Sequence, residues 1–321
     1  MIAKARKMKP LVSVIIVNWN VRDMVLDCIG SIIEQTRSTY EIIVVDNDSS
    51  DGSVDAIKDK FSSVKIIAND SNRGFAAANN QALAVSQGEY VLLLNPDTLV
   101  VDNAIDKMLQ WIQQDSSIGC GGCQVFESEN VIQNTCFSDM TVWSTFLVLT
   151  GLARVSKSSR FWGKPHYYWW DRRTEMEVDV VSGMFMLVPR KVLEEVGGMD
   201  DDFFVYAEEA DWCRRIRAHG YRCVFTPLTH VVHRDGGNKS TDQILAKMYV
   251  QLQKSKLIYA RKYYGLLGYL EFRFLYFASM LMRSVLFVIL SLFTQQGGFR
   301  TKAFLAIQGL KFHTFGKEPS K

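Results

Sequence analysis

The sequence lacks both of the glycine-rich patterns that most readily identify a phosphate-binding site. No strand-like segment is followed by G-x-G-x-x-G or by G-x-x-x-x-G-K-[ST]. In the first pattern, glycines let the backbone approach a dinucleotide, and in the second a loop and its lysine surround the phosphates. A Rossmann dinucleotide site and a P-loop are therefore unsupported, and a bound nucleotide would be held in another way.

Cysteine is scarce, and its spacing completes no metal or redox motif. The six residues are Cys28, Cys120, Cys123, Cys136, Cys213 and Cys223. Cys120 and Cys123 form one C-x-x-C, but no second C-x-x-C and no H-x-x-x-H accompanies it, and no thioredoxin-like pattern surrounds it. We predict reduced, mostly buried thiols in a cytosolic protein, since disulfides are rare in that compartment.

Acidic residues are nearly absent from the last part of the chain. Residues 246–321 contain two acids against twelve Lys or Arg, a net charge of +10, whereas 1–245 carry −7. These basic residues alternate with long apolar runs, which indicates an anionic membrane surface as partner. They form no compact cluster, so we expect no nucleic acid partner.

A signal-peptide cleavage site is also missing. Basic residues precede the apolar run L-V-S-V-I-I-V, as they do in a signal peptide, but the run is short and breaks at Asn18. No small-x-small pattern follows it. We interpret the run as the first strand of the fold and expect the chain to stay in the cytoplasm.

Apolar runs and helical patterns alternate through the first hundred residues. Strands are predicted at 11–17, 41–45, 64–68 and 91–95, and helices at 24–34, 54–61 and 75–86. The run V-L-L-L at 91–94 has no period-2 alternation, which is typical of a strand buried on both faces. The pattern predicts βαβ units, a mainly parallel sheet and right-handed crossovers.

Polar side chains follow the end of each predicted strand. They are Asn18 and Asn20, Asp46 and Asn47, Asn72 and Arg73, and Asn95 and Asp97. Because ligands bind at the carboxyl ends of such strands, we predict a cleft at this edge. Asp97 beside Asn95 suits a divalent cation, Asp46 suits a pyrimidine ring N–H, and Arg73 suits a pyrophosphate. An ordinary N-P-D turn and a solvated arginine are the structural alternatives.

The second half contains three further candidate features. Gly183, in a strand-like run, indicates close approach by a ligand or another backbone. Glu208, Glu209 and Asp211 precede a predicted helix at 212–219, where acids favour a helix start or raise a carboxylate pKa for general base catalysis. Both interpretations stay open. His233 lies three residues after His230, so at most one of them faces the cleft of an extended segment.

The combined segments resemble the inverting GT-A-fold glycosyltransferases of family 2, particularly the rhamnosyltransferase-like branch. The similarity covers about 11–240 and is carried by V-S-V-I-I-V-N-W-N, V-V-D-N-D-S-S-D-G-S, N-R-G-F-A-A-A-N-N, L-L-L-N-P-D-T, V-S-G-M-F-M-L-V-P-R, V-G-G-M-D-D-D-F-F-V-Y-A-E-E-A-D-W-C and V-V-H-R-D-G-G-N-K-S. It implies an α/β fold, a GT-A (Rossmann-like) mainly parallel sheet flanked by helices.

This resemblance implies a nucleotide-diphosphate sugar as donor and Mg²⁺ or Mn²⁺ as cofactor. Asp97 and His233 would bind the metal, and Glu209 would take the proton of an acceptor hydroxyl, with Asp211 and Glu208 in reserve. The expected donor-binding residues are Asn18, Asn20, Asp46, Arg73, Asn79, Asn95, Asp97 and Gly183. The sequence departs from the family's D-x-D at Asn95 and from its E-D-x-D-L-C at Glu209.

We expect a glycosyltransferase domain at 1–240, with a nucleotide-binding half at about 11–100 and an acceptor half at about 101–240. A basic, apolar helical tail would occupy 241–321. Within it, 274–293 has one charge, Arg283, and is long enough to span a bilayer, but a mid-span Arg costs about 2.5–3.5 kcal/mol. We therefore favour a helix lying in the membrane interface over a span, and a buried dimer helix is the third option.

These predictions describe a peripheral enzyme at the cytoplasmic face of the cell membrane, acting on a glycan or lipid-linked acceptor in cell-surface polysaccharide assembly. A homo-oligomer is compatible with them. Two other classes stay open, a nucleotidyltransferase and a non-catalytic nucleotide-sugar-binding member of the fold. The sequence lacks the N-terminal Gly-rich, basic phosphate loop that would favour the first.

Overall fold

The computed structural model describes residues 9–128, 131–156, 158–234, 244–294, 298–316 and 318. The chain forms two compact units. The sheet unit comprises Met1–Cys136, Asp171–Asp201 and Glu209–Ser240, and the helical unit comprises Phe137–Trp170, Asp202–Glu208 and Thr241–Lys321. The boundary expected at 240 and the G-G turn after His233 lie outside the described residues.

The sheet unit alternates strands and helices through its first part, as predicted. Its elements are β1 (Val12–Asn18), α1 (Arg22–Gln35), β2 (Tyr40–Asp46), α2 (Ser53–Lys60), β3 (Lys65–Ala68), α3 (Phe75–Val85), β4 (Tyr90–Leu94), β5 (Thr98–Val100), α4 (Ala104–Ile112), β6 (Ile118–Ser128), β7 (Val131–Ile132), β8 (Cys136–Phe137), β9 (Met176–Glu177), β10 (Val180–Val181), β11 (Phe185–Pro189), α6 (Arg190–Val196), α7 (Glu208–Ala218) and β12 (Arg222–His233).

The main sheet has the strand order β3-β2-β1-β4-β11-β6-β12-β5. The pairs within β3-β2-β1-β4 are parallel, and β12 is parallel to β6, whereas β11 is antiparallel to β4 and β12 is antiparallel to β5. The predicted α/β fold with a mainly parallel sheet is therefore confirmed. The antiparallel strands are β11, from the second half of the chain, and the short β5, which directly follows Asp97.

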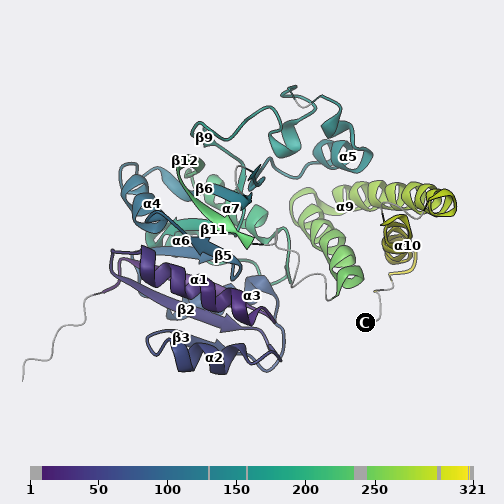
Figure 1. Ribbon diagram of the computed structural model, residues 1–321. Coiled ribbons are helices and arrows are strands. Elements are labelled where there is room, and N and C mark those ends of the chain that lie inside the picture. Colours follow the sequence, from purple (N-terminus) through teal and green to yellow (C-terminus); the bar gives the residue numbers. More distant parts are fainter. Residues whose placement is uncertain are drawn as a thin grey trace, which may run out of the picture. The chain divides into compact units, whose positions relative to one another are not determined.

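Helices cover both faces of this sheet, which explains the unbroken apolar runs (Figure 1). Val12, Val14 and Ile16 of β1 pack in one core with residues of α1, α2 and α4. Helix α3 packs on β1 and β2, and Ile15 and Ile43, which lie outside that core, are also fully buried. Both alternating sets of side chains are thus removed from water.

Helix α2 begins at Ser53, one position before the predicted start at 54. Its N-cap residue is Gly52, which has a φ of 78° and no capping side chain. Asp51 instead accepts a hydrogen bond from the Ser53 backbone N–H at 3.0 Å. Asp51 therefore binds the start of the helix, although Gly52 occupies the left-handed N-cap position.

The helical unit contains α5 (Val142–Thr150), the short 3-10 helices η1 (Leu152–Arg154) and η2 (Lys164–His166), α9 (Leu245–Phe293) and α10 (Phe299–Phe315). Helix α9 consists of two helices joined at a kink, since the backbone of Gly265 is not helical, with a φ of 67° and a ψ of −155°. Within the aromatic segment 141–170, Tyr167 and Trp170 are buried, whereas Trp143 and Phe161 are 45% and 59% exposed.

Helix α9 packs one face against α5 and α10 and leaves an apolar face exposed. Arg283 donates a hydrogen bond to the Leu149 carbonyl of α5, and Arg273 donates to the His313 carbonyl of α10. Meanwhile Leu267, Phe274, Leu281, Met282, Val285, Leu286, Val288, Ile289, Leu292 and Phe293 are all exposed. We call this set the apolar face of α9. By length and composition alone, α9 could cross a membrane, and it is the one such helix among the described residues.

Candidate active site

Asp97 and His233 meet although 136 positions separate them in the sequence. Asp97 directly precedes β5, and His233 is the last residue of β12. These strands pair antiparallel with His233 opposite Thr98, so the register places the histidine beside the aspartate. The His233 Nε2 and Asp97 Oδ1 atoms are 2.9 Å apart, and the two side chains are 1% and 12% exposed.

This pair has the features of two ligands of one divalent cation. Neither atom has a partner with hydrogen-bond geometry in the described part of the chain, although both are buried. Two cis ligands in an octahedral shell with bonds of about 2.1 Å lie about 3.0 Å apart. The observed 2.9 Å therefore fits a shared cation.

Glu209 is held by the backbone of Gly183. The Gly183 N–H donates a hydrogen bond to Glu209 Oε1 at 3.2 Å. A Cβ on Gly183 would lie 3.2 Å from that oxygen and 3.3 Å from the Phe75 ring. The close approach predicted at Gly183 is thus made by the side chains of Glu209 on α7 and Phe75 on α3. Because glycine has no side chain, it leaves room for both of them.

The pKa of Glu209 is raised above its ordinary value of 4.5. Burial of the carboxylate is the main cause, and the backbone N–H groups of Glu209 and Gly183 oppose it, while negative charge on Cys213 adds to it. A carboxylate with a raised pKa is a stronger base, which suits proton abstraction near neutral pH.

Helix α7 begins at Glu208 rather than at the predicted position 212, so the three acids lie in its first turn. Asp211 is fully buried and pairs with Arg215 Nε at 2.8 Å. Arg215 also donates to the carbonyls of Val196 and Gly198. Asp211 therefore stabilises the loop after α6. Glu208 is buried, with 2% of its surface exposed. Of the three acids, Glu209 is the best placed to act as a base.

Two residues with left-handed backbone precede α7. Tyr206 and Ala207 have φ values of 71° and 72°. Such conformations cost roughly 1–3 kcal/mol each for non-glycine residues and concentrate at functional sites.

Backbone pairing between β11 and β4 links the segment that binds Glu209 with the Asp97–His233 pair. Strand β11 is antiparallel to β4, with Phe185 opposite Leu94. Beyond that pair, the Asn95 N–H donates to the Met184 carbonyl at 3.2 Å. The segment that binds Glu209 thus lies against the segment that ends in Asp97.

Asn18 and Asp46 form a buried pair at the ends of β1 and β2. They are register partners, and Asn18 Nδ2 donates to Asp46 Oδ2 at 2.7 Å. The Ser49 N–H donates to Asp46 Oδ1 at 2.9 Å. Asn18 Oδ1 is buried without a partner in the described structure, so it is a further acceptor at this predicted base-binding edge. Sequence reasoning missed Ser49, although it lies in the quoted D-N-D-S-S run.

The other predicted donor-binding residues have local partners. Asn20 Oδ1 accepts the Ser50 N–H, and Asn79 Nδ2 donates to the Phe75 carbonyl inside α3. Arg73 is half exposed and lies 3.5 Å from Asp70, as a solvated turn arginine would. Their contacts with a nucleotide stay predictions.

His230 lies apart from the Asp97 pair. Its ring makes an edge contact with Phe126, with centroids 4.9 Å apart. This agrees with the expectation that at most one of the two histidines faces the cleft.

Gly183→Ala is expected to reduce activity at least tenfold with little loss of stability. The added methyl group would meet Glu209 Oε1 and the Phe75 ring, so the carboxylate would have to move, and small displacements of catalytic groups are costly. Steady-state kinetics and a thermal melt measure the two effects. Unchanged kinetics would show that the Gly183 contact does not position Glu209.

A family model described as glycosyl transferase family 2 matches residues 13–197. The chain belongs to this family. The membership confirms the resemblance drawn from the motifs.

Relatives of this family 2 chain are distant. An uncharacterized protein of Sinorhizobium fredii is 26% identical over 72% of this chain and 25% of its own length. The O-antigen biosynthesis protein RfbC of Myxococcus xanthus is 26% identical over 73% of this chain and 18% of its own. The chain therefore spans a quarter or less of these two proteins. An N-acetylglucosaminyl-diphospho-decaprenol L-rhamnosyltransferase of Mycobacterium tuberculosis is 23% identical over 67% of this chain and 73% of its own length.

Solved structures support the fold of the family 2 chain. A mannosyltransferase from Pyrobaculum calidifontis, in complex with GDP-Man and Mn²⁺, has a TM-score of 0.52 at 18% identity and covers 97% of this chain and 89% of its own. The similarity confirms the predicted GT-A fold.

Proposed function

We propose that this family 2 protein is a metal-dependent inverting glycosyltransferase. It moves a sugar from a nucleotide-diphosphate donor to a hydroxyl group of a glycan or lipid-linked acceptor. The observation that carries the proposal is the arrangement of a carboxylate of raised pKa, Glu209, one hydrogen-bonded segment away from the Asp97–His233 pair. We further propose that the sugar is rhamnose, which is supported by the name of the mycobacterial relative.

The proposed reaction uses Glu209 as general base. Its carboxylate takes the proton of the acceptor hydroxyl, and the oxygen then attacks the anomeric carbon from the face opposite the leaving diphosphate. The Gly183 N–H holds Oε1, so the second carboxylate oxygen is left to accept the proton. Single displacement at this carbon inverts its configuration.

Asp97 and His233 would hold the divalent cation, which neutralises negative charge on the departing diphosphate when bound. The donor set is one carboxylate oxygen and one imidazole nitrogen. Imidazole suits transition metals better than Mg²⁺. We therefore propose Mn²⁺, the ion that accompanies GDP-Man in the archaeal mannosyltransferase structure, as the preferred cofactor.

The deciding experiment measures free nucleoside diphosphate released from a panel of UDP-, GDP- and dTDP-sugars in the presence of Mn²⁺ and acceptor. A glycosyltransferase releases nucleoside diphosphate from one donor class. Pyrophosphate release from a nucleoside triphosphate and sugar phosphate would indicate a nucleotidyltransferase instead, and donor binding without release would indicate a non-catalytic member of the fold.

We propose that the helical unit binds the cytoplasmic face of the cell membrane with α9 lying in the interface. The apolar face of α9 is exposed over several turns, whereas soluble proteins rarely expose so continuous an apolar patch. Arg261, Lys262, Arg300 and Lys302 are exposed in the same unit and would attract anionic lipid. Arg283 is bonded to α5, which favours a helix packed along one side over a lone span.

Replacing Leu292 and Phe293 by glutamate is expected to weaken vesicle binding by roughly a hundredfold. These side chains are 77% and 82% exposed, and burying each in lipid contributes about 1.5–3 kcal/mol. Cosedimentation with vesicles of phosphatidylglycerol and phosphatidylethanolamine measures the effect. The matched control is Leu228→Glu, which changes a leucine that is 54% exposed in the sheet unit. Equal binding by both variants would contradict the proposal.

A further inference from the structure

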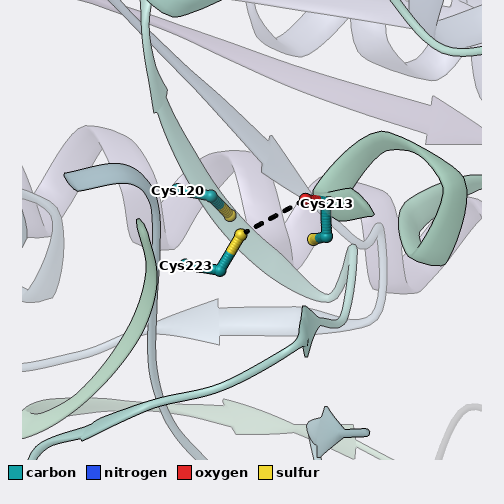
Figure 2. A group of neighbouring side chains, drawn as sticks. All are labelled: Cys120, Cys213 and Cys223. Atoms are coloured by element: carbon teal, nitrogen blue, oxygen red, sulfur yellow. Dashed lines mark hydrogen bonds between the residues drawn. The ribbon is translucent and has the colours of Figure 1, made fainter. Parts of the chain in front are cut away.

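Three cysteines from separate segments meet inside the sheet unit (Figure 2). Cys120 lies on β6, Cys223 on β12 and Cys213 on α7. Cys120 and Cys223 are register partners in the parallel β6-β12 pair. All three sulfur atoms lie within 4.8 Å of one another, and the three side chains are 0% exposed. They form a compact set of three sulfur ligands, the three-thiol cluster.

The cluster differs from the C-x-x-C motif that the sequence displays. Residues three apart on a strand point to opposite faces, and Cys123 accordingly belongs to the core beside α4, which excludes Cys120. The second thiol of the cluster is Cys223, which lies beside Cys120 on the neighbouring strand β12. The third is Cys213, on helix α7. Spacing along the chain therefore could not reveal the group.

Two of the three thiols are oriented by hydrogen bonds to backbone carbonyls. The Cys223 thiol donates to the Cys213 carbonyl at 3.8 Å (Figure 2), and the Cys213 thiol donates to the Val181 carbonyl at 3.8 Å. A thiolate is the form of cysteine that binds metals, so each ligand must lose its proton when a cation binds.

We propose that Cys120, Cys213 and Cys223 form a three-coordinate site for a soft monovalent cation, Cu⁺. Thiolate ligands select Cu⁺ and Zn²⁺ over hard cations. Structural Zn²⁺ takes four ligands, and no fourth Cys, His, Asp or Glu joins the group among the described residues. Complete burial also leaves no exposed surface for a water ligand.

The geometry requires little rearrangement. Three sulfurs around one ion with bonds of about 2.3 Å lie about 4.0 Å apart, so the widest observed separation would close by about 0.8 Å at most. Each thiol that binds Cu⁺ releases its proton to solvent, and neither copper nor sulfur changes oxidation state.

The test is anaerobic titration of the full chain with Cu⁺ in competition with a chromophoric cuprous chelator. We expect one tightly held Cu⁺ per chain, thiolate-to-copper absorption in the ultraviolet and a higher melting temperature, since a ligand that binds only the folded state stabilises it. Cys120→Ala and Cys223→Ala should each weaken binding at least a hundredfold. The matched control is Cys123→Ala, a buried cysteine of the same strand outside the cluster, which should bind as the wild type does.

X-ray absorption on the wild-type protein provides a readout that does not depend on whether any variant folds. We expect three sulfur ligands and no nitrogen or oxygen. Failure of the wild type to compete for Cu⁺, a two-sulfur or mixed shell, or loss of binding in Cys123→Ala would each overturn the proposal. These measurements use no nucleotide sugar, so their outcome is independent of the proposed glycosyl transfer.

Discussion

Glu209→Gln is expected to lower the turnover number by about 10²–10⁴-fold, the range that a positioned general base contributes. Glutamine keeps the shape of the side chain and an oxygen that can accept the Gly183 N–H, but it cannot take a proton. Donor affinity, which does not depend on this proton transfer, should change little. Release of nucleoside diphosphate and a donor-binding titration measure the two effects.

The pH profile gives a second readout of the same residue. A base acts when deprotonated, so the wild-type rate should rise with pH through the raised pKa of Glu209, and the glutamine variant should lose that rise. The control is Glu194→Gln, an exposed glutamate on α6. Near-wild-type transfer by Glu209→Gln would show that another group is the base.

Asp97→Ala is expected to abolish the Mn²⁺ dependence of donor binding and to lower turnover by roughly a thousandfold, because metal stabilisation of the leaving group is worth several kcal/mol. The variant removes one of the two atoms that lie 2.9 Å apart. His233→Ala should have a similar effect, and the double variant should be little worse than either, since residues that act as a unit are not additive.

Isothermal titration of Mn²⁺ and of the donor measures these losses. His230→Ala is the matched control, because it removes an imidazole from the same strand that packs on Phe126 instead. It should retain metal affinity. If Asp97→Ala bound Mn²⁺ as tightly as the wild type, the cation would have to be held elsewhere.

Local patterns predicted the first half of the fold well, because its signals are local. The buried run at 91–94 and the polar residues after each strand correspond to β4 and to the observed strand ends. The pairing of Asp97 with His233 followed only from family resemblance, since it depends on the register of β12 against β5. No property of either segment alone specifies that register.

Other features depend on tertiary packing in ways that hydropathy does not record. The composition of α9 indicated membrane contact, but which of its faces turns inward is set by bonds such as Arg283 to Leu149. The predicted start of α7 is four residues late, because acidic residues are as compatible with the approach to a helix as with its first turn. The three-thiol cluster forms only when β6, β12 and α7 pack together, because each of them contributes one cysteine.

The length of β12 is as constrained as its composition. Side chains of a strand alternate between faces, so a slip of one residue moves every following side chain to the other side. The strand already contains an irregularity between Thr226 and His230. Gain or loss of a single residue beyond it would turn the His233 imidazole away from Asp97 while leaving every amino acid of the centre intact. Homologous enzymes that retain the histidine should therefore tolerate substitutions in this stretch far better than insertions or deletions.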